Sequence, residues 1–524
     1  MTDHTATAAR ALTLEPAMPS THAPTWAGAA WVGAVDRSAA LAADTVQLAG
    51  ATGFRRARLM VRDGDDVAGF VDVRVDEGGA VDPAELGPVL RRLPAPGPAV
   101  DAPASGARVS VVIGTRERAA SLDRAVRSVL ASAYDDFEVF VVDNAPVTTG
   151  TRDVVAALGD PRVNYVLEPR AGVSRARNAG LALASGTVVA FIDDDVVADP
   201  RWMAAIAAAY ERDSDVWCVT GLVPSGELRT PTQRYFDERV TWARNLERRV
   251  LRTASPPVDE PLFPFTVGAF GTGANMSVRR DAVRQLGGFD VALGPGTRAR
   301  AGEDPDLFTR VLLAGGALAV EPSAVVWHEH RKDRAALRSQ AIGYGTGLGA
   351  WVTKLVLRPS TAFAVLRRAA GAVRRLGALG QGADDRPVDA IGGWPVDAEF
   401  TEATRGLKRA ELVAALGGPW RYLAGRLTAR CGAGTPAPAL RQSTRRSTRA
   451  LSRSACAAER TGGPWRRCHG PPVPRGGPAR AGTVPPRRRA SDDGSGTRRP
   501  DPRGSRAARG TPGSSGCVWS RPRS

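Results

Sequence analysis

The sequence predicts an α/β protein whose main domain is a doubly wound, mostly parallel sheet flanked by helices. Between residues 108 and 200, short apolar runs typical of buried strands alternate with segments whose apolar residues have helical spacing. Two of these runs end directly in carboxylates, at Asp143 and at Asp193–Asp195. Ligands of such sheets bind beyond the carboxyl ends of the strands, so these positions are the first candidates for a functional site.

Apolar patterning predicts each element of this region in turn. Runs rich in Val, Ile and Phe predict strands over 109–113, 137–142, 163–167 and 187–192. Apolar residues at helical spacing predict helices over 119–132, 151–158 and 174–184. Ser174 is expected to cap the third of these helices and Gly186 to end it. Asp199 and Pro200 predict the start of a fourth helix, as N-cap and first helical residue.

Composition divides the 524 residues into five regions. In order, they are a flexible leader (1–25), a small β-rich module with a linker (26–100), the α/β domain (108–335), a helical extension (336–427) and a disordered tail (428–524). Within the module, loose alternation over 57–74 around Asp63–Gly64 predicts a β hairpin. The Pro/Ala-rich segment Pro94–Pro103 is typical of a linker.

All of the excess positive charge lies in the tail. Residues 428–524 contain 21 arginines and four acidic residues, which accounts for the whole net charge of +17, while the preceding residues hold 50 basic and 50 acidic side chains. The tail has 14 Gly and 13 Pro but only five Leu, Ile, Val or Phe residues, too few to form a core. It either binds polyanions through counterion release or has no selected function, as in out-of-frame readthrough. Residues 1–427 carry no net charge, which argues against nucleic-acid binding as the main role of the protein.

Cysteine usage and the lack of targeting patterns predict a cytoplasmic protein. Cys218 is the only cysteine before residue 428, so no disulfide scaffold is expected. Residues 1–20 lack a basic segment followed by an apolar run, which argues against a signal peptide. No apolar window reaches the length of a membrane span. Gly343–Leu357 is apolar enough either to pack on the sheet or to lie against the inner face of the plasma membrane.

Three carboxylates, Asp193, Asp194 and Asp195, directly follow the apolar strand predicted over 187–192. Like charges this close repel and raise one another's pKa, and a bound divalent cation offsets that cost. Oxygen ligands of this kind suit Mg²⁺ or Mn²⁺. The alternative is a solvated acidic turn, but the position at the end of a strand favours the metal.

Two later segments add titratable groups. Glu303 and Asp304 open a predicted helix, where a carboxylate is either a helix cap stabilised by the dipole or a general base. His328 and His330 follow a strand predicted over 318–327, and an imidazole there is either a surface group or a further metal ligand.

Taken in order, these segments resemble the family 2 glycosyltransferases of the GT-A fold. The resemblance covers about residues 108–335 and rests on VSVVIGTRER, VVDNAP, GVSRARNAGL, FIDDD, GTGANMSVRR, GGFD, the GED segment and the HEH segment. The first strand ends in GTRER, where many members have a PTYNR-like run. The resemblance implies metal-dependent, inverting transfer of a sugar from a nucleotide-diphosphate sugar to a hydroxyl of a glycan, a lipid-linked molecule or a small molecule.

The resemblance also implies roles for the candidate residues. Nucleotide binding falls to Thr115, Arg118, Asp143, which resembles the residue that reads the base, Arg177, Asp193 and Asp194. Asp195, with Asp193 and His328, resembles the metal site that holds the diphosphate, and Asp304, beside Glu303, resembles the catalytic base. Gly273, Ala274 and Asn275 fall where such enzymes build the acceptor and sugar pocket.

Two other functions remain open at this point. A sugar-nucleotide nucleotidyltransferase shares a related fold, but Gly114-Thr115-Arg116 lacks the rest of that class's glycine-rich signature. A non-enzymatic protein that binds polyanions through the basic tail would not need Asp195 or Asp304. The sequence favours the glycosyltransferase, with Mg²⁺ or Mn²⁺ as cofactor.

Overall fold

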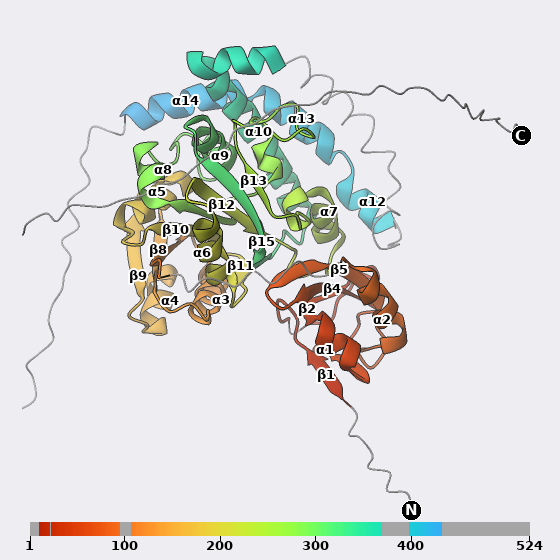
Figure 1. Ribbon diagram of the computed structural model, residues 1–524. Coiled ribbons are helices and arrows are strands. Elements are labelled where there is room, and N and C mark those ends of the chain that lie inside the picture. Colours follow the sequence, from red (N-terminus) through yellow and green to blue (C-terminus); the bar gives the residue numbers. More distant parts are fainter. Residues whose placement is uncertain (1–9, 21, 95–105, 369–397, 432–524) are drawn as a thin grey trace, which may run out of the picture. The chain divides into compact units, whose positions relative to one another are not determined.

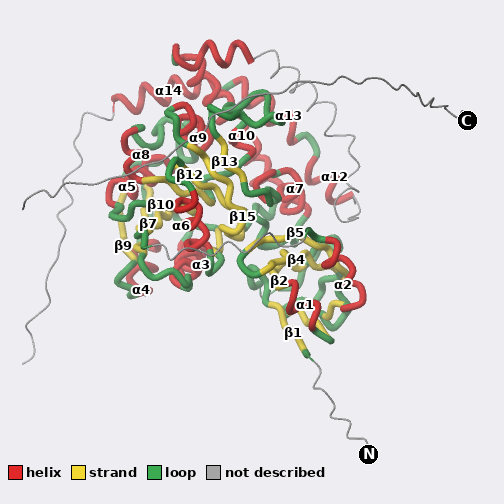
Figure 2. The backbone as a smooth tube through the Cα atoms, viewed as in Figure 1, coloured by secondary structure: helices red, strands yellow, loops and turns green. Residues whose placement is uncertain are grey.

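The computed structural model describes residues 10–20, 22–94, 106–368 and 398–431 (Figures 1 and 2). All of them belong to one compact unit that extends from Met1 to Ala439. The predicted linker, apart from Pro94, and the predicted tail, apart from residues 428–431, lie outside the described residues. The predictions for those segments therefore stay predictions.

The N-terminal module consists of two three-stranded sheets and two helices (red and orange in Figure 1). One sheet has the order β1-β3-β6 and the other the order β2-β4-β5. The elements are β1 (Ala11–Leu14), β2 (Trp31–Asp36), α1 (Arg37–Ala42), β3 (Thr45–Leu48), β4 (Arg56–Asp63), β5 (Asp66–Arg74), β6 (Ala80–Val81) and α2 (Pro83–Arg92). The predicted hairpin is confirmed, because β4 and β5 pair antiparallel with Asp63 opposite Asp66 and Gly64 in the turn at φ 60°.

The structure differs from the flexible leader predicted over 1–25. Strand β1 pairs in parallel with β3, with Ala11 opposite Thr45 and Leu14 opposite Leu48. Leu14 and Met18 are buried. A four-residue strand carries too short a pattern to be recognised, and its partner lies some 34 residues later in the chain. Residues 10–20 therefore belong to the module.

A nine-stranded sheet forms the centre of the α/β domain (Figure 2). Its order is β11-β15-β12-β14-β10-β7-β8-β9, and β13 pairs with β15. The strands are β7 (Val109–Thr115), β8 (Phe137–Asn144), β9 (Val163–Glu168), β10 (Val188–Asp193), β11 (Val196–Ala198), β12 (Val216–Leu222), β13 (Arg249–Leu251), β14 (Asn275–Arg279) and β15 (Ala317–His328). The predicted array of four parallel strands is confirmed in β10-β7-β8-β9.

Beyond β10 the sheet is mixed rather than mostly parallel. Strand β14 runs antiparallel to both β10 and β12, and β11 runs antiparallel to β15. Strand β11 follows β10 after only Asp194 and Asp195, but it lies at the far edge of the sheet beside β15, which itself pairs in parallel with β12. The apolar pattern of a strand does not state its direction, so the sequence could not predict this half of the sheet.

Helices cover both faces of the sheet. They are α3 (Ala119–Leu130), α4 (Gly150–Leu158), α5 (Val173–Leu183), α6 (Trp202–Arg212), α7 (Pro231–Arg239), α8 (Arg280–Gln285) and α9 (Glu303–Leu313), with short 3₁₀ turns at Thr241–Ala243 and Val267–Ala269. Successive residues of β7 enter different cores: Val111 lies in the same cluster as Leu122 of α3, and Val112 in the same cluster as Leu181 of α5. Burial on both faces explains the nearly continuous apolar run of this strand.

Two predicted helix starts differ in detail. Helix α5 has Gly172 as its N-cap, and the Ser174 hydroxyl inside the first turn donates to Leu293 O at 2.8 Å instead of capping the helix. Helix α6 begins at Trp202, after Pro200 rather than at it. The Asp199 carboxylate accepts a hydrogen bond from Arg201 N at 3.0 Å, so it still stabilises the turn that leads into the helix.

The extension after β15 is helical. It comprises α10 (Arg334–Leu357), a helical segment over 359–368, α12 (Ala398–Thr404), α13 (Leu407–Leu416) and α14 (Gly418–Cys431). Gly343, Thr346, Trp351 and Leu355 are buried, so one face of the apolar segment over 343–357 packs in the interior. Its other face carries the exposed side chains of Leu348, Val352, Val356 and Leu357. Among the helices that the structure describes, none has the length and hydropathy needed to cross a bilayer.

Buried ion pairs join the N-terminal module to the α/β domain. Arg58 in β4 contacts Asp237 in α7, and Arg62 Nη2 lies 2.7 Å from Asp199 Oδ2. Both arginine side chains are buried. These pairs link β4 to α7 and to the residues before α6.

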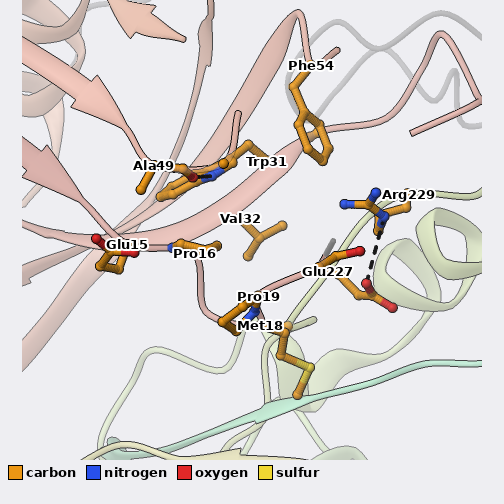
Figure 3. Close-up of a pocket in the computed structure, with 14 residues that line it drawn as sticks. Glu15, Pro16, Met18, Pro19, Trp31, Val32, Ala49, Phe54, Glu227 and Arg229 are labelled. Atoms are coloured by element: carbon orange, nitrogen blue, oxygen red, sulfur yellow. Dashed lines mark hydrogen bonds and ion pairs between the residues drawn. The ribbon is translucent and has the colours of Figure 1, made fainter. Parts of the chain in front are cut away.

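A cavity of about 180 Å³ lies where the module meets the α/β domain (Figure 3). Trp31 and Phe54 line it from the module, and Glu227 and Arg229 line it from the segment between β12 and α7. The Arg229 guanidinium lies 5.2 Å from the centre of the Phe54 ring. None of the candidate residues predicted from the sequence lines this cavity, so it is separate from the site described next.

Candidate active site

Three neighbouring strands bring the candidate nucleotide residues to one edge of the sheet. Thr115 ends β7, Asp143 lies near the end of β8 and Asp193 ends β10. The pairing registers place Thr115 opposite Asp143 and Asp193 opposite Gly114. All of these strands are parallel, so their carboxyl ends meet, as the sequence predicts.

Asp193, Asp195 and His328 form a cluster with the geometry of a cation site. One ligand atom from each residue can be chosen so that all three lie within 4.8 Å of one another. His328 reaches the carboxylates because β11 pairs antiparallel with β15, with Val196 opposite His328. Two carboxylates and an imidazole are a donor set that Mg²⁺ or Mn²⁺ accepts, so these residues fit a divalent cation.

Electrostatics distinguish the three aspartates. Burial would raise the pKa of Asp195, but His328 and Arg118 outweigh it and hold that pKa well below its usual value. Burial raises the pKa of Asp193 and of Asp194, although Arg177 and Arg118, respectively, oppose the shift. Asp195 is therefore the carboxylate that stays ionised most firmly, which suits a metal ligand.

Arg118 and Thr115 hold the acidic turn from the side of β7. Arg118 Nη1 donates to Asp194 Oδ1 and to Asp195 Oδ2, both at 2.9 Å. Thr115 Oγ1 donates to Asp194 Oδ2 at 2.6 Å. Both carboxylate oxygens of Asp194 thus accept hydrogen bonds from protein side chains. Asp193 and Asp195 instead form the cluster with His328.

A single buried arginine joins the two acidic elements. Arg177 Nη2 lies 3.2 Å from Asp193 Oδ1, and its Nη1 lies 2.6 Å from Asp304 Oδ1 and 3.2 Å from Glu303 Oε1. The Arg177 side chain is only 5 % exposed. Carboxylates more than a hundred residues apart in sequence therefore meet at one guanidinium, and both acidic elements belong to one site.

Glu303 and Asp304 differ in their surroundings. Asp304 also accepts a hydrogen bond from Gly273 N at 2.7 Å, and its side chain is 16 % exposed. Glu303 is more deeply buried, and burial together with the Asp304 charge raises its pKa to about 8. At neutral pH Asp304 is therefore the member of the pair that is open to a ligand, and Glu303 is largely protonated.

Asp143 has one oxygen free to bind a ligand. Its Oδ2 accepts a hydrogen bond from the Tyr165 hydroxyl at 2.9 Å, while Oδ1 is buried and has no hydrogen-bond partner among the described residues. A buried acceptor with no partner costs free energy, which a ligand N–H group at this position would recover.

The structure adds site residues that the sequence did not single out. Tyr165 orients Asp143, and Arg331 Nη1 lies 3.6 Å from Asp195 Oδ2. Glu117, at φ 55°, accepts hydrogen bonds from the backbone of Val147 and Thr148 and so ties together the loops after β7 and β8. The sequence signal was weak in each case, because each residue acts through a partner distant in the chain.

His330 supports His328 directly. The Nδ1 atoms of the two rings lie 2.8 Å apart, and the His330 ring packs 4.4 Å from that of Phe236. Burial and the neighbouring His328 lower the pKa of His330 well below its usual value, so its ring is neutral. From the sequence alone, His330 could equally have been a second metal ligand beside His328.

The residues expected to build an acceptor pocket separate into two groups. Gly273 contributes its backbone N–H to Asp304. Asn275 instead lies in β14 with no exposed surface, where it accepts from Trp202 Nε1 and donates to Leu222 O and Ala324 O. All of its hydrogen bonds are used within the fold, so Asn275 stabilises the sheet rather than facing a ligand.

Part of the chain is similar to known proteins. Residues 110–287 match the family described as "Glycosyl transferase family 2". The chain is 33 % identical over 192 residues to the glucosyl-dolichyl phosphate glucuronosyltransferase of Haloferax volcanii, covering 36 % of this chain and 57 % of that protein. It is 30 % identical over 226 residues to the pre-mycofactocin glycosyltransferase of Mycobacterium tuberculosis, covering 43 % of each. The chain thus spans about half the length of these relatives.

A solved structure is also similar. The mannosyltransferase PcManGT from Pyrobaculum calidifontis, in complex with GDP-Man and Mn²⁺, is 20 % identical with a TM-score of 0.36, and the match covers 65 % of this chain and 80 % of that one.

Proposed function

Because residues 110–287 form a family 2 glycosyltransferase domain of the GT-A type, we propose that the chain transfers a sugar from a nucleotide-diphosphate sugar to a hydroxyl acceptor with inversion at the anomeric carbon. The observation that supports this most strongly is the Arg177 contact, which joins the DDD turn to the Glu303–Asp304 pair. Transfer needs a group that stabilises the leaving diphosphate and a separate group that removes a proton, and the site supplies one of each.

The nucleotide is proposed to bind at the ends of β7 and β8. The free Oδ1 of Asp143 accepts an N–H of the base, and Tyr165 fixes the orientation of that carboxylate. Thr115 and Arg118, which hold Asp194, line the path from the base toward the diphosphate.

Asp193, Asp195 and His328 are proposed to hold the cation beside the diphosphate. A divalent cation bound there neutralises the negative charge that develops on the leaving group, as a Lewis acid. Asp195 remains ionised because His328 and Arg118 lie next to it, and Arg118 contributes a further positive charge at the same edge.

Asp304 is proposed to be the general base. Arg177 and Gly273 N use two of its lone-pair positions and leave others free to accept the acceptor hydroxyl proton. General-base catalysis typically contributes about 10²–10⁴-fold to the rate. Arg177 is a positioning residue here, because it fixes Asp304 relative to the cation ligands without touching the acceptor.

The experiment measures release of nucleoside diphosphate from a panel of nucleotide sugars, with Mn²⁺ and a mixture of hydroxyl acceptors. Asp304→Asn is expected to lower turnover by about 10²–10⁴-fold. The exposed Asp281→Asn in α8 serves as the matched control and should not change it. Turnover of Asp304→Asn near that of the unsubstituted chain would contradict the assignment of the base. Release of pyrophosphate from a nucleoside triphosphate would instead favour the nucleotidyltransferase.

A further inference from the structure

Helices α13 and α14 expose a continuous apolar stripe. Its members, spaced three or four residues apart, are Leu412, Leu416, Trp420, Leu423 and Leu427, with exposed fractions of 59, 83, 76, 43 and 64 %. Gly417 between the helices has right-handed helical angles of φ −80° and ψ −11°, so the helical spacing continues across the junction. The spacing therefore places these side chains on one face of α13 and α14, the helices drawn in blue in Figure 1.

The opposite face of these helices is already packed. Leu407 and Tyr422 are buried, and Gly418 lies against Gly349 of α10 so closely that a Cβ atom on either glycine would overlap backbone. The small residues let the helix backbones approach one another and fix the orientation of α13 and α14. The apolar stripe consequently points outward from a rigid support and is not a core face displaced from its position.

A groove lined by arginines flanks the stripe. Arg338 of α10 and Arg409 and Arg421 of α13 and α14 line it, together with Ile342 and Val413, around a volume of about 490 Å³. No carboxylate lines this groove, and among the residues that the structure describes none of the three guanidinium groups forms an ion pair. By contrast, Arg310 of α9 pairs with Asp306 at 2.8 Å.

We propose that this face docks on an anionic lipid bilayer. The leucines and Trp420 would enter the boundary between headgroups and acyl chains, where amphipathic helices and tryptophan side chains are stabilised. Arg338, Arg409 and Arg421 would bind lipid phosphates, for which the planar guanidinium is well suited. The proposal does not depend on the sugar transfer, because it concerns a different surface and a different ligand.

Charge complementarity favours a bilayer over a second copy of the chain. Between residues 407 and 428 there are four basic side chains and one acidic one, Glu411, which is bound by Arg239. Two copies meeting at this face would bring six unpaired guanidinium groups together without carboxylates to neutralise them. An anionic membrane supplies both the apolar phase and the phosphates.

Flotation of the full chain with vesicles tests the proposal. The vesicles contain either phosphatidylcholine alone or phosphatidylcholine with phosphatidylglycerol. The Arg-rich sequence after residue 431 can bind anionic vesicles by itself, so the discriminating variant replaces apolar groups: Leu416→Gln with Trp420→Gln. Both sites are exposed and glutamine is a good helix former, so the fold should be retained. An unchanged melting temperature confirms this.

The double apolar variant is expected to weaken partitioning into the anionic vesicles on the order of tenfold or more. Arg409→Gln with Arg421→Gln is expected to weaken it about fivefold per arginine at low salt. The matched controls are Val258→Gln, which is fully exposed, and Arg91→Gln with Arg92→Gln in α2. Neither control should change the partitioning.

Three results would overturn the proposal. The first is failure of the full chain to float with anionic vesicles. The second is flotation that both helix variants retain, since binding would then come from elsewhere in the chain. The third is a concentration-dependent dimer, measured by light scattering, that Leu416→Gln with Trp420→Gln abolishes, since the stripe would then be a contact between copies of the chain.

Discussion

The candidate active site and the groove beside α13 differ in whether carboxylates compensate their arginines. In the candidate active site, Arg177 is buried and pairs with three carboxylates. In the groove beside α13, Arg338, Arg409 and Arg421 line an open surface without a carboxylate among the lining residues. A buried charge is tolerated only with partners, so pairing identifies where the fold depends on charge. The guanidinium groups of the groove have no carboxylate beside them, and these are the groups proposed to bind lipid phosphates.

The largest effect should follow from removing the central guanidinium. Arg177→Met leaves Asp193, Glu303 and Asp304 close together without a counter-charge, and we expect unfolding free energy to fall by about 3–5 kcal/mol. Urea denaturation measures this change. A loss below about 1 kcal/mol would mean that the carboxylates do not need Arg177, and the contrast between the two regions would fail.

A pH-dependent effect is expected at Glu303. Its folded-state pKa, about 8, lies above the usual 4.5, so the folded protein holds a proton that the unfolded chain releases as pH rises from 4.5 to 8. The glutamate therefore lowers stability progressively over that range. Glu303→Gln should be more stable than the unsubstituted chain by roughly 2–4 kcal/mol at alkaline pH and nearly equal to it near pH 4.5.

Thermal unfolding of both proteins across this pH range gives the comparison. Equal pH dependence of the two melting temperatures would show that Glu303 is ionised in the folded protein at neutral pH.

A smaller effect is expected at His330. When His328 Nε2 binds a cation, its Nδ1 carries the proton and donates to His330 Nδ1, 2.8 Å away. His330→Phe removes the acceptor and should weaken Mn²⁺ binding about 10–100-fold. His330→Asn keeps an acceptor in the same region and should restore part of the affinity. Mn²⁺ titration followed by electron paramagnetic resonance measures both, and equal affinities in all three proteins would contradict the role.

The smallest effect belongs to an exposed pair. Arg127 and Asp123 lie one helical turn apart in α3 at 2.8 Å, with the arginine side chain 61 % exposed. Arg127→Gln should leave the midpoint of urea denaturation unchanged, because solvent and salt screen such pairs. A loss comparable to that of Arg177→Met would show that burial does not distinguish the two kinds of pairing.

Local signals in the sequence predicted the half of the sheet that carries the nucleotide residues. Strands β7, β8 and β10 are buried on both faces and so have nearly continuous apolar runs. Asp143 and Asp193 could be predicted as site residues because each stands where such a run ends. The sequence missed the pairing of β1 with β3 and the antiparallel strands, because strand direction and distant pairing leave no local pattern.

The same distinction applies to the candidate site. The carboxylates were predicted because acidic residues after apolar runs are conspicuous in the sequence. The joining role of Arg177 was not, because it depends on α5 and α9 approaching from different parts of the chain. Tyr165 and Glu117 were missed for the same reason, since each acts through a partner on another element.

Calorimetric titration of nucleotide sugars into three proteins tests the central claim most directly. The claim predicts that, with Mn²⁺ present, Asp304→Asn binds the donor within about threefold of the unsubstituted chain, because the base acts on the acceptor. Asp195→Asn should lose the Mn²⁺-dependent part of donor binding. If both substitutions weaken donor binding equally, or if neither does, the separate roles proposed for Asp195 as metal ligand and Asp304 as general base are contradicted.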